Sequence, residues 1–199
     1  MTSLSTSVYG QKGVEKLLED PSLTQIFIEA AQFSSLQLSS KVTKTLSVKA
    51  HLEGEYSEHQ LLSFVRKGNT LFISPNFSDD FKLPNDKLGA HKVFAIDVRA
   101  EIPEHMEVIV SGGTLQLTAS GNYKKLQIRL NEGYCGLEKL AGRVSVFTKT
   151  APIFLKQSSG QLTAQSTYGQ VFLVPIKMGP ATITLSSVSG DIRLLPQQP

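Results

Sequence analysis

Short bursts of alternating apolar and polar residues fill the second half of this chain. Each burst holds two apolar residues separated by one other residue, which is the period-two pattern of a half-buried β-strand. The bursts come in pairs whose first members lie nine residues apart. The five pairs are Val108/Val110 with Leu117/Ala119, Leu126/Ile128 with Cys135/Leu137, Val144/Val146 with Ile153/Leu155, Leu162/Ala164 with Val171/Leu173, and Ile183/Leu185 with Ile192/Leu194.

The pairs themselves repeat along the chain. Their first residues are 108, 126, 144, 162 and 183, which gives steps of 18, 18, 18 and 21 residues. The longer last step indicates a three-residue insertion near residues 178–180, where Met-Gly-Pro favours a bulge. Internal periods of this length are typical of solenoids. The pattern therefore predicts an all-β, single-domain β-solenoid with turns of about 18 residues, in which Leu126, Val144 and Leu162 lie one above another.

The polar segments between the bursts predict tight corners. Residues 132–133, 149–152, 167–169 and 188–191 contain Gly, Pro or Asp together with small polar residues. Gly supplies backbone conformations that other residues avoid, and Pro presets one of the turn angles.

The first half of the chain is rich in β-strand patterns but lacks the 18-residue step. Apolar or alternating runs of strand length cover residues 24–30, 36–38, 46–52, 61–65, 71–73 and 93–102. Lys67-Gly68-Asn69 predicts a hairpin turn, and only residues 14–18 and 58–62 could form a helical turn. We expect residues 12–199 to form one β-strand-repeat domain, with irregular capping strands over 12–102 and regular turns over 103–199.

A polar stretch over residues 76–91 predicts a surface loop. Asp79, Asp80 and Asp86 in this loop are weak candidates for a calcium site, because calcium accepts six to eight oxygen ligands and tolerates irregular loops. Their spacing misses the EF-hand pattern, and the Gly-rich repeat of calcium β-rolls is absent. A solvated acidic loop is the favoured interpretation.

The last hundred residues, from Ile102-Pro103 to Ser189-Gly190-Asp191-Ile192-Arg193-Leu194, resemble the bacterial putative-adhesin family of β-strand-repeat proteins. Residues 52–56 (Leu-Glu-Gly-Glu-Tyr) and 84–88 (Pro-Asn-Asp-Lys-Leu) are similar to its Bacteroidetes-type version. Residues 159–161 and 168–170 depart from the Ser-Gly-Asp pattern. The resemblance implies a solenoid and export from the cytoplasm. It implies no catalytic residues, since the family has no assigned function.

Charge and composition exclude several partners. The 20 basic and 17 acidic side chains, for a net charge of +3, are dispersed along the sequence, so neither a nucleic-acid surface nor a polybasic membrane patch is expected. No apolar run approaches the length of a membrane-spanning helix. A protein or a glycan at the cell surface is the expected partner, and the oligomeric state stays open.

The N-terminus leaves the compartment open. Residues 1–11 are rich in Ser and Thr and lack the basic and apolar regions of a complete signal peptide. Val8 and Gly10 stand where a signal peptidase prefers small residues, so this segment reads either as the remnant of a signal peptide or as a disordered N-terminus. An extracytoplasmic location, in the periplasm or at the cell surface, follows from the first interpretation. A cytoplasmic location follows if Met1 is the true start.

Candidate chemical groups are few. Cys135 is the only cysteine and takes an inward slot of the repeat, so we expect a buried structural residue rather than a nucleophile. The histidines share no metal-ligand spacing; they are His51, His59, His91 and His105. No nucleophile elbow, phosphate loop or dinucleotide motif is present, and no cofactor or catalytic residue is expected. An exposed aromatic patch could draw on Tyr56, Tyr123, Tyr134 and Tyr168, although ordinary surface residues are the simpler interpretation.

Three functions are compatible with these features. The first is a non-enzymatic, exported β-solenoid that acts as an adhesin-like or envelope structural protein through a broad face. The second is a polysaccharide hydrolase or lyase that uses carboxylates on one solenoid face. The third is a cytoplasmic interaction protein. Two carboxylates with a basic residue in one groove would favour the enzyme, and a face rich in Ser and Thr would favour binding.

Overall fold

The protein is built from β-strands alone in the residues that its structure, a computed structural model, describes: 12–54, 60–77 and 94–195. The first seven strands are β1 (Lys12–Glu19), β2 (Gln25–Ala30), β3 (Ser35–Lys41), β4 (Thr45–Gly54), β5 (Gln60–Lys67), β6 (Thr70–Phe77) and β7 (Phe94–Pro103). The others are β8 (Glu107–Thr148), β9 (Ile153–Lys156), β10 (Ser159–Ser166), β11 (Val171–Phe172), β12 (Lys177–Ser187) and β13 (Ile192–Leu195). None of these segments forms a helix with the length and apolar character needed to cross a membrane.

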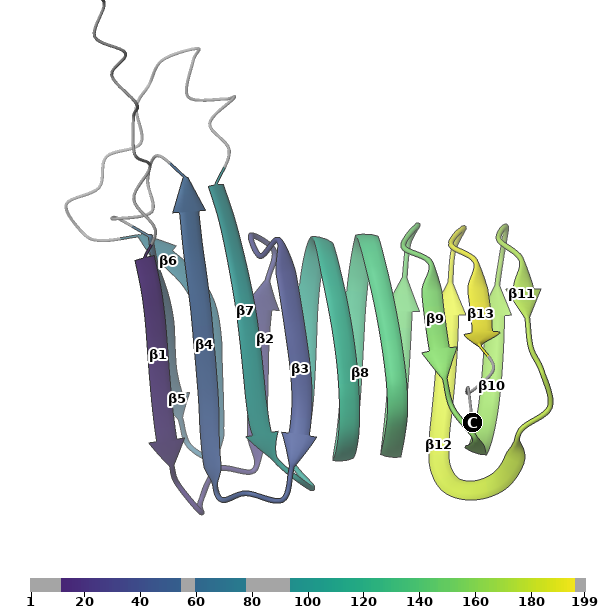
Figure 1. The fold of residues 1–199 in the computed structure, drawn as a ribbon, viewed down its shortest axis with the longest axis horizontal. Coiled ribbons are helices and arrows are strands. Elements are labelled where there is room, and N and C mark those ends of the chain that lie inside the picture. The colour runs from purple at the N-terminus through teal and green to yellow at the C-terminus, as the bar shows by residue number, and fades with distance from the viewer. Residues whose placement is uncertain (1–11, 55–59, 78–93, 196–199) are drawn as a thin grey trace, which may run out of the picture.

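All thirteen strands belong to one mixed sheet. Its main path runs β1-β4-β7-β3-β8-β2-β6-β5, and β9 to β13 branch from β8 at the other end. The pairs β1·β4, β4·β7 and β5·β6 are antiparallel, and the rest are parallel. Figure 1 shows the 42-residue strand β8 winding back on itself, so that its successive segments lie side by side.

Alternate side chains of the winding strands fill the interior. Cys135 pairs with Ile153 and Leu137 with Leu155 across β8 and β9, and both pairs keep the predicted 18-residue step. These inward residues are at most 2% exposed, so the period-two pattern identified these core positions correctly. It was wrong for Val171 and Leu173, which are 37% and 47% exposed. The apolar area that the buried residues remove from water supplies the main drive for folding.

The predicted order of the last turns is wrong. Ile183 on β12 pairs with Val144 on one side and with Leu162 on the other, so the segment 177–195 lies between the two turns that precede it in the chain. Leu162 therefore does not lie on Val144. The alternation of apolar residues fixes which face a side chain takes, but it does not fix the neighbouring strand. A regular 18-residue solenoid in chain order is thus not what the sheet forms.

The three-residue insertion is where the sequence predicted it. Ser159 pairs with Lys177, an offset of 18, whereas Gln161 pairs with Thr182, an offset of 21, and the register shift lies between the two positions. The extra residues Met178, Gly179 and Pro180 are therefore absorbed as an irregularity at the start of the β10·β12 ladder.

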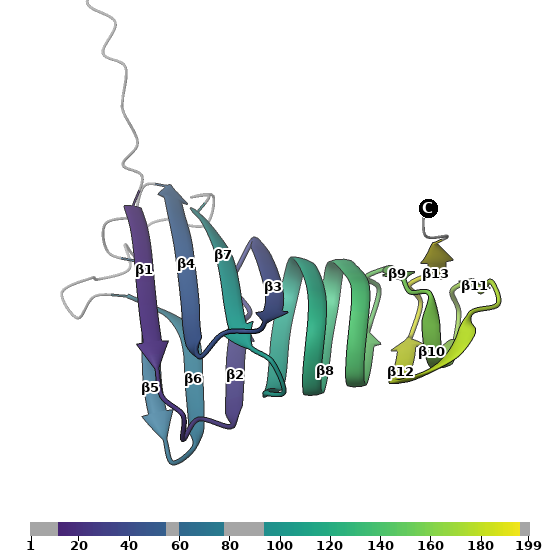
Figure 2. The ribbon, with the colours of Figure 1, turned by 60° about the horizontal axis from the view of Figure 1, so that its bottom comes forward.

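In the first half of the chain, too, strands lie between strands that are not their neighbours in the sequence. Ile26 on β2 pairs in parallel with Val108 and with Leu71, and β3 likewise lies between β7 and β8. The strands β1, β4 and β5 continue the sheet at this end with antiparallel pairing (Figure 2). The hairpin turn after Lys67 is confirmed, with Gly68 at φ 58°. The helical turn predicted at residues 14–18 is wrong, because they belong to β1; of residues 58–62, those described begin β5.

Hydroxyl groups and small residues hold the corners of the last turns together. Thr148 donates from Oγ1 to the Ala151 carbonyl at 2.8 Å, and Ser187 Oγ lies 2.8 Å from Thr148 Oγ1. Ser187 Oγ also accepts a hydrogen bond from the Gly190 amide at 2.8 Å. Because these groups are buried or nearly so, each bond satisfies a polar atom that water cannot reach.

Gly190 packs directly on the next turn, and this contact gives a stability test. A Cβ at residue 190 would collide with the Ala151 carbonyl oxygen, a backbone atom that cannot move aside cheaply. Gly190→Ala should therefore lower the free energy of unfolding by roughly 1–3 kcal/mol, as overpacking usually does. Urea denaturation followed by circular dichroism measures the change. Gly13→Ala is the control, because nothing lies within 4 Å of a Cβ there; equal effects of both substitutions would contradict the contact.

Candidate functional site

A groove crosses the outer face formed by β7, β3, β8 and β9, the front of Figure 1. Its volume is about 500 Å³. Six strand segments line it, since β8 contributes two and β13 contributes Leu195. Because neighbouring strands lie about 4.8 Å apart, the groove extends over roughly 24 Å. The groove is long enough to hold an extended ligand.

The strand register builds the groove from two rows of outward-facing side chains. In the first row, Gln37 pairs with Arg99 on one side and Thr118 on the other. In the second row, Ser39 pairs with Glu101 and with Ser120. Because Ser39, Thr118 and Ser120 are shorter than Arg99 and Glu101, they form a low floor beside a charged wall.

Two aromatic rings form the other end of the groove. Tyr134 and Phe154 are stacked, with ring centroids 5.2 Å apart and planes at 23°. Gly136 lies beneath the tyrosine, since a Cβ at residue 136 would stand 2.8 Å from Tyr134 Cε1. Both rings are only half-buried. A stacked aromatic pair that is partly exposed offers a flat apolar surface next to polar groups, the composition of many ligand sites.

The charged wall is held in place by hydrogen bonds. Lys41 Nζ lies 2.7 Å from Glu101 Oε1, and the hydrogen bond from Lys41 lowers the pKa of Glu101 from its ordinary value. Arg99 donates from Nε to Gln37 Oε1 at 3.1 Å. These contacts orient a carboxylate, a guanidinium and an amide along one edge of the groove.

The groove contains the carboxylates and basic residues expected of an enzyme and also the hydroxyl side chains expected of a binding surface. Glu101 and Glu138 line it together with Arg99 and Lys156, and so do several hydroxyl side chains. A glycosidase needs one carboxyl group that stays protonated to act as the general acid. The lowered pKa of Glu101 opposes that role, because this carboxyl group is ionised and paired with Lys41.

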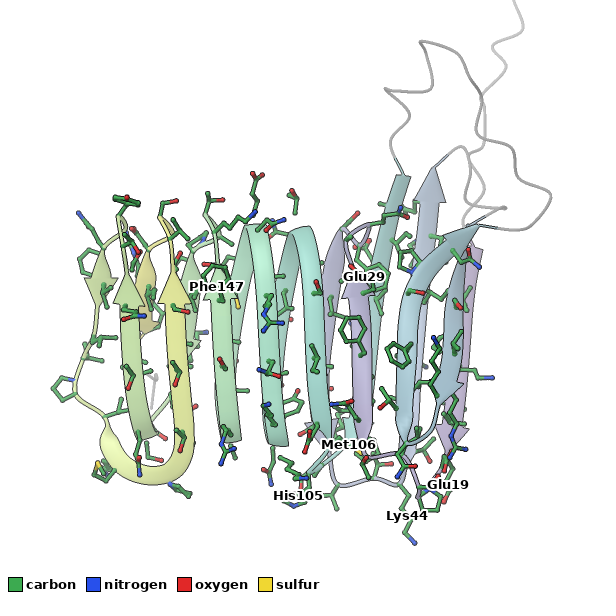
Figure 3. All side chains as sticks on the ribbon, turned by 180° about the vertical axis from the view of Figure 1, so that it is seen from behind. Glu19, Glu29, Lys44, His105, Met106 and Phe147 are labelled. Atoms are coloured by element: carbon green, nitrogen blue, oxygen red, sulfur yellow. The ribbon has the colours of Figure 1, made fainter. Side chains whose placement is uncertain are left out.

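A second hollow of about 370 Å³ lies at the lower end of the first turns. Glu19, Lys44 and Met106 belong to its rim or lining and are labelled in Figure 3. Most of the remaining lining is apolar and includes Leu18, Leu23, Ile26 and Leu46. The groove remains the better candidate, because its rows of polar groups can orient a ligand.

The tyrosines named from the sequence do not form one patch. Tyr134 lies in the groove, but Tyr123 is buried, donates its hydroxyl proton to the Ser120 carbonyl at 2.8 Å, and has its pKa raised by burial. Tyr168 is 81% exposed at a corner, and Tyr56 lies outside the described residues. Sequence reasoning missed Phe154. Its position between the inward residues 153 and 155 was the available signal that it faces outward.

The other candidate groups among the described residues are not part of the groove's lining, although His51 lines an adjoining hollow together with Gln37 and Arg99. His51 contacts Glu53 at 2.8 Å, and His105 lies at the lower rim (Figure 3). His59, His91 and the proposed calcium ligands Asp79, Asp80 and Asp86 lie outside the described residues, as does the segment 1–11. Within the described residues, no three His, Cys, Asp or Glu side chains are grouped as metal ligands would be.

Cys135 is fully buried, and burial raises the pKa of its thiol to about 12. The charged thiolate, the reactive form, is thus disfavoured in the folded protein. The unfolded chain ionises at the thiol's ordinary pKa, whereas the folded chain keeps the thiol neutral up to its raised pKa. The neutral thiol's contribution to the free energy of unfolding is therefore fully present below the ordinary pKa and is lost as the pH rises through the folded pKa.

Thiol labelling tests this burial. At neutral pH the native protein should label many-fold more slowly than the protein in denaturant, as measured by the absorbance of a chromogenic disulfide reagent. Ser145→Cys serves as a positive control, since residue 145 is exposed. Fast stoichiometric labelling of Cys135 in the native protein would contradict its position.

Comparison with known proteins places the fold. No protein-family model matches the chain, and no curated protein matches it significantly. Among solved structures, a putative cell adhesion protein from Clostridium sporogenes has a TM-score of 0.65 at 16% identity, covering 94% of this chain and 100% of that one. This chain therefore shares the fold of that protein.

Two further structures carry related names. A putative adhesin from Bacteroides fragilis has a TM-score of 0.38 at 10% identity, covering 92% of this chain and 97% of its own. A putative lipid binding protein from Parabacteroides distasonis has a TM-score of 0.28 at 12% identity, covering 92% and 96%. Their similarity is too low to argue from. The printed name of the Clostridium sporogenes protein, whose fold this chain shares, agrees with the resemblance to the putative-adhesin family.

Proposed function

We propose that this protein is a non-enzymatic, exported binding protein that holds a glycan in the groove across β7, β3, β8 and β9. The observation that carries the proposal is the stacked pair Tyr134–Phe154 at one end of two polar rows. The name of the Clostridium sporogenes protein, a putative cell adhesion protein, supports a role at the cell surface.

The chemistry of a sugar matches the two parts of the groove. A pyranose ring has an apolar face of C–H groups, which can lie on an aromatic surface, and a rim of hydroxyl groups. Arg99 and Gln37 supply donors and an acceptor for those hydroxyl groups, and Glu101 supplies further acceptors. Thr118 and Ser120 can both donate and accept. An extended groove with repeated polar rows suits a chain of sugars better than a single small molecule.

The same arrangement supports binding rather than hydrolysis. Glu101 is exposed, paired with Lys41 and ionised, so a protonated acid would have to come from another group. Glycan turnover measured by release of reducing ends is the outcome that would favour a polysaccharide-acting enzyme instead.

The groove lies within a single β-strand-repeat domain in this proposal. We propose that residues 103–199 form the turns of a β-solenoid and that residues 12–102 form its cap, as one domain. The 18-residue offsets between β8 and β9 support the turns, and the antiparallel pairs of β1, β4 and β5 support the cap. In this arrangement the groove crosses the boundary between cap and turns, because β3 and β7 supply one half of it and β8 and β9 the other.

Glycan binding can be tested by substitution in the aromatic pair. The wild-type protein is first screened on a glycan array, and the affinity of the best ligand is then measured by titration calorimetry. Tyr134→Ala and Phe154→Ala should each weaken binding at least tenfold, about 1.4 kcal/mol, because each removes half of the apolar platform. Unfolding midpoints measured in parallel confirm that the variants fold.

The opposite face offers a matched control. Phe27 on β2 and Phe72 on β6 form an aromatic pair there, with ring centroids 5.6 Å apart. Phe72→Ala removes one ring of that pair and should leave the affinity unchanged. Equal losses from Phe72→Ala and Phe154→Ala, or a wild-type protein that binds no glycan, would contradict the proposal.

A further inference from the structure

The outermost strands at the C-terminal end of the sheet are β10 and β11. Among the described strands, β10 pairs only with β12 and β11 only with β13. Figure 1 shows both at the end of the molecule opposite to β1 and β5. One side of β10 therefore presents backbone amide and carbonyl groups without a strand partner, which is the arrangement that recruits another strand.

The interior is open at this end. Leu162 and Ala164, which take inward slots on β10, are only partly buried, whereas Ile183 and Leu185 beside them are at most 1% exposed. A hollow of about 590 Å³ lies between β10 and the segment 173–178. Large apolar side chains around it are exposed: Phe172 47%, Leu173 47%, Val174 45% and Met178 81%. An apolar patch of this kind on a sheet end is typical of an interaction surface.

The outermost strands β10 and β11 contain no charged residue, and charged side chains of this end such as Lys177 and Arg193 belong to the strands inside them, β12 and β13. Residues 157–176 form a run of 20 residues without a single Lys, Arg, Asp or Glu. Edge strands are normally protected by charged side chains. The opposite end is protected in that way, since β1 contains two Lys and two Glu and β5 ends in Arg66-Lys67. Among the described edge strands, β10 and β11 thus lack this barrier to association.

We propose that this C-terminal edge pairs with the same edge of a second copy to form a two-fold symmetric, end-to-end dimer. The uncharged edge is complementary to itself, because two copies meet without repulsion of like charges. The charged strands β1 and β5 are a poor match for it, so a closed dimer is favoured over a head-to-tail filament.

Two-fold symmetry also fixes how the edges meet. A two-fold axis makes the two β10 strands antiparallel, and an axis near Thr163 sets Leu162 opposite Ala164 of the second copy. Residues directly opposite one another share a face of the sheet. The inward residues of both copies would then close one continuous core, while Gln161 and Gln165 would meet on the outer face and hydrogen bond.

Sedimentation velocity over a concentration series tests the dimer. The wild-type chain should sediment as a dimer that dissociates on dilution. Thr163→Lys sets two like charges near the axis and should weaken the dimer at least tenfold, while residue 163 is exposed and the fold is left intact. Ser63→Lys, on the outer strand β5, is the matched control and should not change the dimer.

Disulfide cross-linking tests whether β10 forms the contact between the two copies. Thr163→Cys should form a disulfide between copies under oxidising conditions, because residues at a two-fold axis come within bonding range, whereas Ser63→Cys should not. A wild-type chain that is monomeric up to its solubility limit would overturn the proposal and leave the edge to a different partner. Filaments, or equal weakening by Thr163→Lys and Ser63→Lys, would overturn it as well.

Discussion

The parallel register between neighbouring turns is the constraint on which the rest of the structure depends. Ile192 pairs with Ile153 on one side and with Val171 on the other, so its side chain enters the interior only while both ladders hold. A slip by one residue would turn every inward side chain of that strand to solvent. The corners depend on the same register, because Gly190 packs on Ala151 and Gly169 packs on Gly190 without room for a Cβ. Packing inside the turns and glycine at the corners are therefore two consequences of one alignment.

The same register also aligns the side chains on the outer face. Because residues that pair across strands also share a face, the inward ladders that bury Leu38 and Leu137 set Ser39 and Glu138 in line outside. The groove is thus built from positions that the core does not constrain, and these positions are free to carry ligand chemistry. If two copies join through β10, each dimer would present two such grooves. Two weak glycan contacts on one particle would then act together and raise the overall affinity, provided that both can be reached at once.

The sequence predicts which residues are buried better than it predicts which strands lie side by side. Alternation and the 18-residue step identified the buried residues of β8 and β9, and Met178-Gly179-Pro180 marked the register shift correctly. The order of the last turns could not be inferred, because Leu162 and Ile183 are both apolar and either could lie beside Val144. The site was harder still. Alternation shows that Arg99 and Phe154 face outward, but it does not show which strands lie side by side. Nothing in the sequence therefore indicated that these two residues, which are 55 positions apart, line one groove.

Disulfide formation between engineered cysteines tests the inserted order of the turns most directly. Ser145 pairs with Thr184, and Thr184 pairs with Thr163, with all three side chains exposed. The double variant Ser145→Cys/Thr184→Cys should therefore oxidise within a single chain, as seen on a non-reducing gel and by peptide mass spectrometry. Ser145→Cys/Thr163→Cys should not, because two strand spacings, roughly 9.6 Å, exceed the reach of a disulfide. An intrachain bond between residues 145 and 163, without one between 145 and 184, would mean that the turns stack in chain order and would contradict the account.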